Sequence, residues 1–463
     1  MLQFMNPVFR FHLFSSSFRS AVVSLLCAVA LPLHAAIDAP VSPNAIPAVG
    51  TLLNFLDQTS GNYILSGQQE RSWDRNGLNF DVNYIIANTG KSPAVRGFDF
   101  LQHVYSPSVR AQQDATERAI AWAQNGGIVT FCCHMFMNIG STDGTPQFYT
   151  PGSNNNPTGT NFDIRQAVIS GTPENIEYLA KLDIIAAELT KLRNAGVPVI
   201  WRPFHECGGT WFWWSRYGAA PFIEAYRIMF DRYTQVHGLT NLIWVFNPID
   251  SGSTMQNWYP GDSYVDMISL DVYPAAGTHP TYATDSQTMR NFKNGRKVVA
   301  MSECGSIPDP DQLNANTVWS YFCTWNGFEN DLSRHTVAFL QKVYNHAKVI
   351  TLDELPAFYV PFPLAVVPAF TLQPTSTTAT TGASVTFSAA ASGTPTPTFQ
   401  WQKNAVNIAG ATGNSYTIPV VTSGDAGNYT VVATNSTGST TSNPAVLSII
   451  VPPSGAIITI TVE

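Results

Sequence analysis

The sequence predicts two folded units in succession, an α/β barrel and a small all-β sandwich, and three observations lead to this prediction. Eight short apolar segments alternate with amphipathic helical patterns between about residues 45 and 360. Several of these segments lack polar alternation, as expected for parallel strands buried on both faces. After Pro363 the composition changes to Thr, Ser, Ala, Gly and Val, with apolar and polar residues alternating as in a half-buried sheet.

The first unit alternates predicted strands and helices. The clearest helix is Glu174–Ala195, which Gly196 ends and Pro198 follows; Ser108–Gln124 and Pro221–His237 are further helices. Eight strands with intervening helices over roughly 300 residues are typical of a (β/α)8 TIM barrel. An open doubly wound sheet is the competing fold, but no glycine-rich dinucleotide fingerprint follows any strand. The predicted strands are Tyr63–Gly67, Ala94–Phe98, Ile128–Cys133, Val197–Pro203, Leu242–Asn247, Val265–Tyr273, Lys297–Glu303 and Trp319–Trp325.

The second unit carries two marks of an immunoglobulin-like sandwich. Trp401 resembles the buried tryptophan of such domains, and the run Asp425–Tyr429 resembles their tyrosine corner. Ala389 and Val431 stand where the paired cysteines would be, so core packing alone must hold this sandwich. The predicted division is a signal peptide at 1–36, a barrel domain at 37–365, an immunoglobulin-like sandwich at 366–451 and a short tail at 452–463.

The composition excludes several classes of protein. Of the 463 residues, 44% are hydrophobic and 12% charged, about half the usual charged share, which excludes a disordered chain. The net charge is −7 and no basic stripe is present, so no nucleic-acid partner is expected. Five of the six cysteines lie beyond the leader without C-x-x-C spacing, which argues against a disulfide framework or a zinc site.

The N-terminus resembles an export signal. Positive charge precedes the apolar run Ala21–Leu33, and the small residues Ala35 and Ala36 follow it. The run is shorter than the ~20 residues that span a bilayer, although an uncleaved anchor is the alternative. We therefore expect a secreted monomer, extracellular or periplasmic, with no membrane span in the mature chain.

Two strand ends carry the chemistry. The predicted fourth strand leads into Arg202, His205 and Glu206, followed by a glycine turn and four aromatic residues in five positions. The predicted seventh strand ends at Glu303. Because the carboxyl ends of barrel strands share one rim, both glutamates should face the same mouth. Two such carboxyl groups are what glycoside hydrolysis requires, whereas a structural ion pair under an aromatic core is the alternative for the first cluster.

These motifs carry a resemblance to a known family. The segment RPFHE followed by GTWFWW, together with SECG around Glu303, resembles the glycoside hydrolase family 26 β-mannanases of clan A over roughly residues 45–360. The resemblance implies a retaining mechanism with Glu206 as general acid/base and Glu303 as nucleophile. It implies no cofactor and no metal, and a mannan-type polysaccharide as the substrate. Residues that match substrate-binding positions are His134, Arg202, His205, Trp211, Tyr273 and Trp325.

Physical expectations accompany these roles. Glu206 needs an apolar or carboxylate-rich setting that raises its pKa, and Tyr273 with cationic neighbours should favour the charge of Glu303. A platform of Trp211, Trp213 or Trp214 would stack on sugar rings.

Other candidate residues have plainer interpretations. His134 alone would be a satisfied core histidine, and no third His or Cys completes a zinc pattern with it and His205. Cys207 and Cys304 follow the two glutamates and are interpreted as buried inert thiols. Three aspartates that could suggest a metal cluster are interpreted as surface, helix-end and strand-end residues, namely Asp262, Asp266 and Asp271.

The resemblance predicts an endo-β-1,4-mannanase, and two alternatives stay open. Another retaining β-glycanase on the same barrel, such as a β-1,3-xylanase or a mixed-linkage glucanase, would differ in loops that include the disordered-looking stretch Thr150–Asn161. A non-catalytic carbohydrate-binding protein is the second alternative, against which the presence of both glutamates argues. The sandwich is interpreted as a spacer, with a stability partner and a weak polysaccharide binder as the alternatives.

Overall fold

The computed structural model describes residues 36–71, 79–355, 366–394, 396–435 and 438–452. Almost all of the predicted signal peptide and tail lie outside the described residues. Within these ranges, no helix combines the length and the apolar character needed to cross a membrane.

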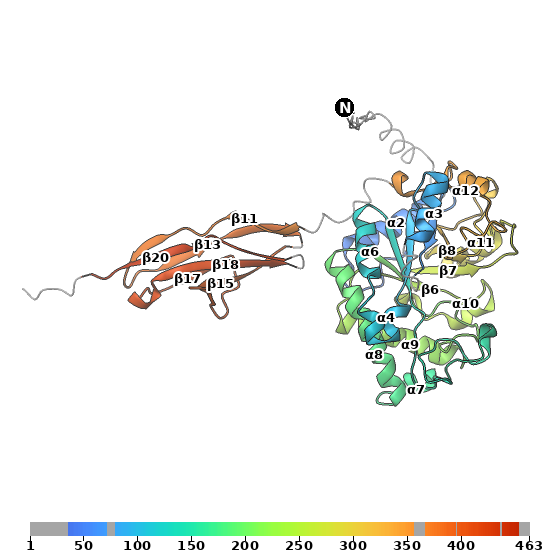
Figure 1. The fold of residues 1–463 in the computed structure, drawn as a ribbon, viewed down its shortest axis with the longest axis horizontal. Coiled ribbons are helices and arrows are strands. Elements are labelled where there is room, and N and C mark those ends of the chain that lie inside the picture. Colours follow the sequence, from blue (N-terminus) through green and yellow to red (C-terminus); the bar gives the residue numbers. More distant parts are fainter. Residues whose placement is uncertain (1–35, 72–78, 356–365, 395, 436–437, 453–463) are drawn as a thin grey trace, which may run out of the picture.

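Eight parallel strands close into a barrel, which confirms the predicted TIM barrel (Figure 1). Each strand pairs with the next one along the chain, and the last pairs with the first. Glu206 follows the fourth barrel strand and Glu303 lies in the seventh, as predicted. The strands are β2 (Gly67–Gln69), β3 (Val95–Asp99), β4 (Ile128–Cys132), β5 (Val199–Arg202), β6 (Leu242–Phe246), β7 (Met267–Val272), β8 (Val298–Cys304) and β9 (Phe322–Thr324).

The first strand differs from its prediction. The middle of the segment Tyr63–Gly67 forms β1 (Ile64–Leu65), which pairs outside the barrel with β10 (Val349–Ile350). The barrel strand β2 starts only at Gly67, where an added Cβ would lie 2.4 Å from the Phe322 carbonyl oxygen. The two glutamines that complete β2 are buried, so hydropathy could not mark them as strand.

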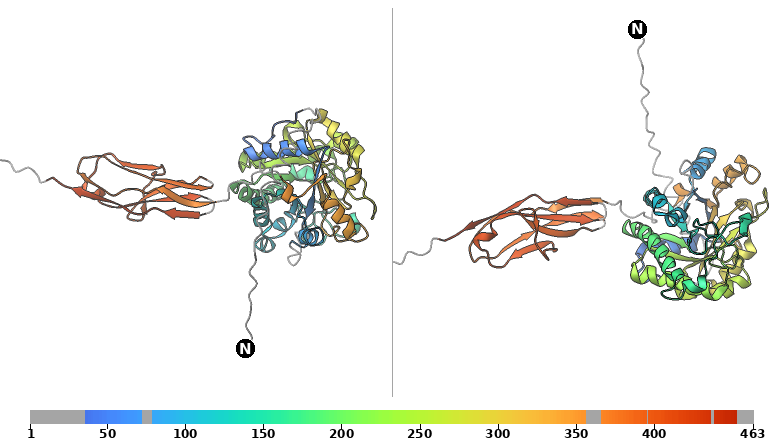
Figure 2. Two further views of the ribbon diagram at one scale, coloured as in Figure 1. Left: turned by 90° about the horizontal axis from the view of Figure 1, so that it is seen from above. Right: turned by 60° about the horizontal axis from the view of Figure 1, so that its bottom comes forward.

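Helices surround the barrel (Figure 2). The helix predicted at Glu174–Ala195 is confirmed as α8 (Pro173–Asn194), which the Thr172 side chain caps by accepting the Asn175 N–H. The segment 108–124 divides into two helices, and the segment 221–237 continues from α9 into a π-helical turn. The other helices of the barrel domain are α2 (Pro47–Thr59), α3 (Phe80–Thr89), α4 (Leu101–Tyr105), α5 (Pro107–Arg110), α6 (Ala115–Gln124), α7 (Ile164–Ala167), α9 (Ala219–Asp231), α10 (Ser253–Trp258), α11 (Ala283–Asn291) and α12 (Val337–Tyr344).

Apolar side chains fill one end of the barrel and leave the other to polar groups. The first residues of several strands, among them Val95, Ile128 and Val298, form one core cluster with α2. A second cluster lies between the strands and the outer helices. The carboxyl ends of the strands are thereby free to carry buried polar side chains.

The second domain is an all-β unit, as predicted. Trp401 is fully buried in its core, and the Tyr429 hydroxyl donates to the Asp425 carbonyl oxygen at 2.9 Å, as in a tyrosine corner. Ala389 and Val431 are both buried at the positions of the missing disulfide. The strands are β11 (Val366–Leu372), β12 (Thr377–Thr380), β13 (Val385–Ser388), β14 (Ala390–Thr394), β15 (Thr398–Lys403), β16 (Val406–Asn407), β17 (Ser415–Ile418), β18 (Gly427–Asn435), β19 (Gly438–Thr441) and β20 (Ala445–Ile450).

Candidate active site

A cavity of about 450 Å³ lies at the carboxyl ends of the barrel strands. Glu206 and Glu303 both line it, although 97 positions separate them in the sequence. Five of the residues predicted to bind substrate line it as well, namely His134, His205, Trp211, Tyr273 and Trp325. The sixth, Arg202, lies beneath the carboxyl groups and contacts Glu303.

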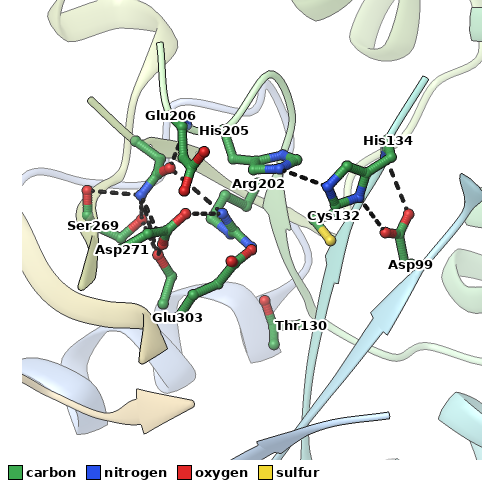
Figure 3. A network of polar contacts seen from close by, with 12 residues as sticks. Asp99, Thr130, Cys132, His134, Arg202, His205, Glu206, Ser269, Asp271 and Glu303 are labelled. Carbon is green, nitrogen blue, oxygen red and sulfur yellow. Dashed lines mark hydrogen bonds and ion pairs between the residues drawn. The ribbon is translucent and has the colours of Figure 1, made fainter. Parts of the chain in front are cut away.

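Three carboxyl groups, rather than two, meet in this site (Figure 3). One oxygen of each of Glu206, Asp271 and Glu303 lies within 4.8 Å of the others. From the sequence, Asp271 was interpreted as a strand-end residue without a function. It stands two positions before Tyr273 near the end of β7, and residues i and i+2 of a strand face the same side, so this spacing would have indicated it.

Arg202 and Tyr273 hold two of these carboxyl groups in place. The guanidinium of Arg202 donates to Asp271 Oδ2 at 2.8 Å and forms a second ion pair with Glu303. The Tyr273 hydroxyl donates to Glu303 Oε2 at 2.6 Å. Charge-assisted hydrogen bonds of this kind fix the direction of a carboxylate as well as stabilise it.

Glu206 is held by different partners. The Trp211 Nε1–H donates to Glu206 Oε2 at 2.7 Å, and the Glu206 backbone N–H donates to Asn247 Oδ1 at 2.6 Å. Glu206 has a φ of 54°, a left-handed conformation that is unfavourable for a residue with a Cβ. The hydrogen bond to the buried Asn247 stabilises the backbone in this conformation. The carboxyl group of Glu206 then points into the cavity.

Burial raises the pKa of both glutamates. The pKa of Glu206 rises to about 7 through burial and the neighbouring charge of Asp271, as the sequence predicted. The pKa of Glu303 rises to about 8 because burial and Asp271 outweigh Arg202 and Tyr273. Arg202 and Tyr273 do favour the charge of Glu303, as expected, but burial and the third carboxyl group, which was not expected, reverse the net shift of its pKa.

The tryptophans of the motif divide between wall and core. Trp211 is partly exposed and lines the cavity, whereas Trp213 and Trp214 are fully buried. Their ring N–H groups donate to the carbonyl oxygens of Met135 and His205, at 2.8 and 2.9 Å. The prediction that either of these two could stack on a sugar is therefore wrong, because neither side chain is exposed to the cavity.

Four further lining residues escaped the sequence analysis, namely Tyr149, Asn154, Phe212 and Phe328. Asn154 belongs to the stretch Thr150–Asn161 that looked disordered, and Tyr149 directly precedes this stretch. The Asn154 side-chain amide donates to the Tyr149 hydroxyl at 2.9 Å, and Thr150 N–H donates to the Trp211 carbonyl oxygen at 2.8 Å. Hydrogen bonds that join distant loops leave no local sequence signal.

The other aspartates and the cysteines take structural places. Asp262 begins a turn at the surface, but Asp266 is buried rather than at a helix end, and it accepts the backbone N–H groups of Val41 and Trp244 at 2.8 Å each. Burial raises the pKa of Cys207 and raises that of Cys304 to about 12, as expected of inert thiols.

Among the residues that the structure describes, two groups of side chains have the spacing of metal ligands. One is the carboxyl group cluster already described, into which the Arg202 guanidinium projects. The other comprises Asp99, Cys132 and His134, where the Cys132 thiol donates to a backbone carbonyl oxygen and burial raises its pKa. Because a guanidinium occupies one group and a protonated thiol belongs to the other, we assign neither to a metal.

The fold and the site define a class of protein, a TIM barrel with paired carboxyl groups in an aromatic-walled cavity at its catalytic rim. Residues 41–354 match the profile of glycosyl hydrolase family 26, and residues 367–435 match an immunoglobulin domain. The chain belongs to glycosyl hydrolase family 26.

Characterised relatives agree with this membership. A mannan endo-1,4-beta-mannosidase of Thermothelomyces thermophilus is 36% identical over 326 residues, which cover 68% of this chain and 62% of the relative. A mannan endo-1,4-beta-mannosidase B of a Piromyces species is also 36% identical, over 69% of this chain and 54% of the relative. The chain thus spans only about half to three fifths of the length of these two relatives.

Two solved structures show the same barrel. The GH26-CBM35 beta-(1,4)-mannanase of Podospora anserina is 34% identical with a TM-score of 0.62, and 72% of each chain is covered. The beta-mannanase from a symbiotic protist of the termite Reticulitermes speratus, complexed with gluco-manno-oligosaccharide, is 35% identical with a TM-score of 0.63. The match covers 69% of this chain and 98% of the protist enzyme.

Proposed function

We propose that this protein is a secreted endo-β-1,4-mannanase that cleaves mannan-type polysaccharides with retention of configuration. One observation carries the mechanism: an oxygen of Glu206 lies within 4.8 Å of an oxygen of Glu303. Retaining enzymes have carboxyl groups only about 5–5.5 Å apart, whereas inverting enzymes leave about 6.5–9.5 Å for a water molecule. The names of the relatives supply the substrate class.

The two glutamates take complementary roles in this proposal. Glu303 attacks the anomeric carbon while Glu206 gives its proton to the glycosidic oxygen, so that the leaving sugar departs and a glycosyl-enzyme ester forms. In the second step Glu206 removes a proton from water, the water oxygen attacks the same carbon, and the Glu303 carboxylate leaves.

The distribution of positive charge supports this division. Arg202 contacts Asp271 and Glu303, and Tyr273 also donates to Glu303. Glu206 receives a neutral N–H from Trp211. Burial and Asp271 raise the pKa of both glutamates, and that of Glu303 more. The direct hydrogen bonds from Arg202 and Tyr273 nevertheless stabilise a carboxylate at Glu303, and Glu206 has no cationic donor, so in the reactive state we place the charge on Glu303 and the proton on Glu206.

The remaining cavity residues suit a sugar ring. His134, Trp211 and Trp325 offer flat surfaces for its C–H faces. Tyr273 and Arg202 orient the carboxyl group of Glu303, and His205 contacts the His134 ring. Secretion through the segment 1–36 and a monomeric state remain part of the proposal.

Alanine variants test the two roles. Glu206→Ala and Glu303→Ala should each lower kcat on mannan by about 10³-fold or more, because each removes a group that acts only in the transition state. On an aryl mannoside whose leaving group needs no protonation, Glu206→Ala should recover part of the first step and Glu303→Ala none. Mannan hydrolysis near the wild-type rate in either variant would contradict the assignment.

A substrate panel tests the specificity. The purified protein should release mannooligosaccharides of several sizes from galactomannan or linear mannan, as an endo-acting enzyme does, and little from β-1,3-xylan or mixed-linkage glucan. Chromatography of the products separates endo from exo cleavage. Preferred cleavage of another glycan would favour the alternative β-glycanase, and binding without any release would favour a carbohydrate-binding protein.

A further inference from the structure

A chain of hydrogen bonds links three side chains behind the carboxyl groups, and the proposed reaction does not use it. Asp99, His134 and His205 lie at or just beyond the carboxyl ends of β3, β4 and β5, three consecutive barrel strands (Figure 3). His134 Nδ1 lies 2.6 Å from Asp99 Oδ2, and His134 Nε2 lies 3.1 Å from His205 Nε2. The exposed fractions are 2%, 8% and 1%.

Asp99 is oriented by the backbone. Its Oδ1 accepts the backbone N–H of Leu101 at 2.8 Å and that of His134 at 3.1 Å. Oδ2 therefore faces the imidazole of His134. Two backbone N–H donors on one oxygen and the imidazole of His134 facing the other stabilise the ionised form of Asp99. A carboxylate only accepts, so the proton of this contact sits on His134 Nδ1.

One proton remains to be placed, between the two Nε2 atoms. If it sat on His134, that ring would be an imidazolium, and the neutral His205 would carry its own proton on Nδ1. His205 Nδ1 is buried and has no hydrogen-bond partner among the residues that the structure describes. This atom lacks a partner in either arrangement, as an unmatched N–H or as an unmatched acceptor, so it does not decide between them. The two arrangements differ in charge, because an imidazolium at His134 would place a positive charge among buried side chains next to His205, on which the guanidinium charge of Arg202 already acts. Placing the proton on His205 Nε2 leaves both rings neutral.

We propose that Asp99 is a positioning residue that fixes the protons of both histidines, with Nδ1–H on His134 and Nε2–H on His205. The two rings are then neutral and locked where they meet the aromatic wall, His134 against Trp325 with ring centroids 5.9 Å apart and His205 against Phe212 at 5.0 Å. A neutral pair adds no positive charge beside Glu206, so it leaves the proton of that group available for the leaving sugar.

Asp99→Asn is the decisive variant because the backbone determines how the amide must lie. The two N–H donors at Oδ1 keep the amide oxygen on their side, so the NH₂ group faces His134 Nδ1. His134 must then carry its proton on Nε2, and His205 must carry its proton on Nδ1. The substitution thus inverts both tautomers while it changes hardly any volume.

NMR of protein with ¹⁵N-labelled histidine rings reads the tautomers directly and needs no substrate, so its outcome is independent of the proposed function. Loss of individual signals in His134→Gln and His205→Gln assigns the rings. The wild-type protein should show Nδ1–H on His134 and Nε2–H on His205, and Asp99→Asn the reverse. An imidazolium at His134, or Nδ1–H on His205 in the wild type, would overturn the proposal even if the variant does not fold.

The kinetic arm rests on the proposed mannanase activity. Asp99→Asn should lower kcat on mannan by roughly 10- to 100-fold with a smaller change in KM, as expected when a supporting partner of an active-site group is altered. Asp266→Asn is the matched control, since Asp266 is also buried and also accepts two backbone N–H groups, but it lies outside the cavity. It should lower stability without changing the histidine spectra or kcat. Unchanged spectra and kcat in a folded Asp99→Asn would reject the proposal.

Discussion

At the scale of the residue, Asp271 controls the charge of the two glutamates. It shares Arg202 with Glu303 and accepts further hydrogen bonds from Ser302 and Asn247, at 2.7 and 3.2 Å. Its negative charge raises the pKa of both Glu206 and Glu303 after burial has already done so. One guanidinium cannot neutralise three carboxylates, so one of the glutamates keeps a proton at a pH where an isolated carboxyl group would have lost it.

Removing that charge should move the pH profile of activity. Activity requires an ionised Glu303 and a protonated Glu206, and Asp271→Asn lowers the pKa of each. Both limbs of the kcat/KM profile should therefore shift to lower pH, by about one unit, and kcat should fall because Arg202 loses a partner. Asp262→Asn, at the surface, is the control. Limbs that stay in place would show that Asp271 does not act on the glutamates through its charge.

At the scale of the element, the loop after β9 carries Trp325 and Phe328 to the cavity, and a buried pair of carboxyl groups anchors it. Asp81 accepts the Gly327 backbone N–H at 3.2 Å and the Arg71 guanidinium at 2.9 Å. Glu329, fully buried, accepts from the Gln68 amide at 3.3 Å, and the carboxyl group of Asp81 is its neighbour. Burial and the neighbouring Asp81 raise the pKa of Glu329 to about 8.

This anchor makes stability depend on pH. The pKa of Glu329 in the folded state, about 8, exceeds its ordinary value of 4.5, so the unfolded chain loses the proton first. The unfolding free energy should fall as pH rises from about 4.5 to about 8. Glu329→Gln removes this dependence and should gain on the order of 2 kcal/mol relative to the wild type between pH 5 and 9. Urea unfolding of the wild type and of Glu329→Gln at pH 5 and at pH 9 measures this gain, and the exposed Glu117→Gln is the control. If the two proteins differed in unfolding free energy by the same amount at both pH values, Glu329 would not retain a proton in the folded state.

Some helices and strands could be predicted from the sequence alone, and others could not. Uninterrupted apolar strands such as β6 and a capped helix such as α8 were predicted within a few residues, because local pattern determines them. β2 was misplaced because its glutamines are buried by pairing with β3 and β9, not by hydrophobicity. Glu206 and Glu303 could be predicted from strand ends, whereas Asn154 reaches the cavity on a loop that the hydrogen bond from Thr150 N–H to the distant Trp211 carbonyl oxygen holds in place.

At the scale of the whole molecule, the chain has separate hydrophobic cores. The two core clusters of the barrel contain no residue beyond Leu355, and the cluster around Trp401 contains none before Phe370. The large apolar side chains exposed on the described part of the sandwich are Val, Leu and Ile, with no aromatic ring among them. Tyr416, a ring of intermediate exposure, also lies on this domain, so its role as a spacer stays a prediction.

A truncated chain tests whether the sandwich contributes to catalysis. Deleting residues 366–463 removes none of the cavity lining and none of the barrel core, so kcat/KM on soluble mannan should stay within about twofold of the full-length value. Thermal unfolding should lose the transition of the sandwich and keep that of the barrel. Sedimentation with insoluble mannan measures binding, and both chains should bind equally if the sandwich acts only as a spacer. Binding at least tenfold weaker after truncation would instead make the sandwich a polysaccharide-binding domain, whose contact surface would have to be built from the Thr and Ser side chains of its strands.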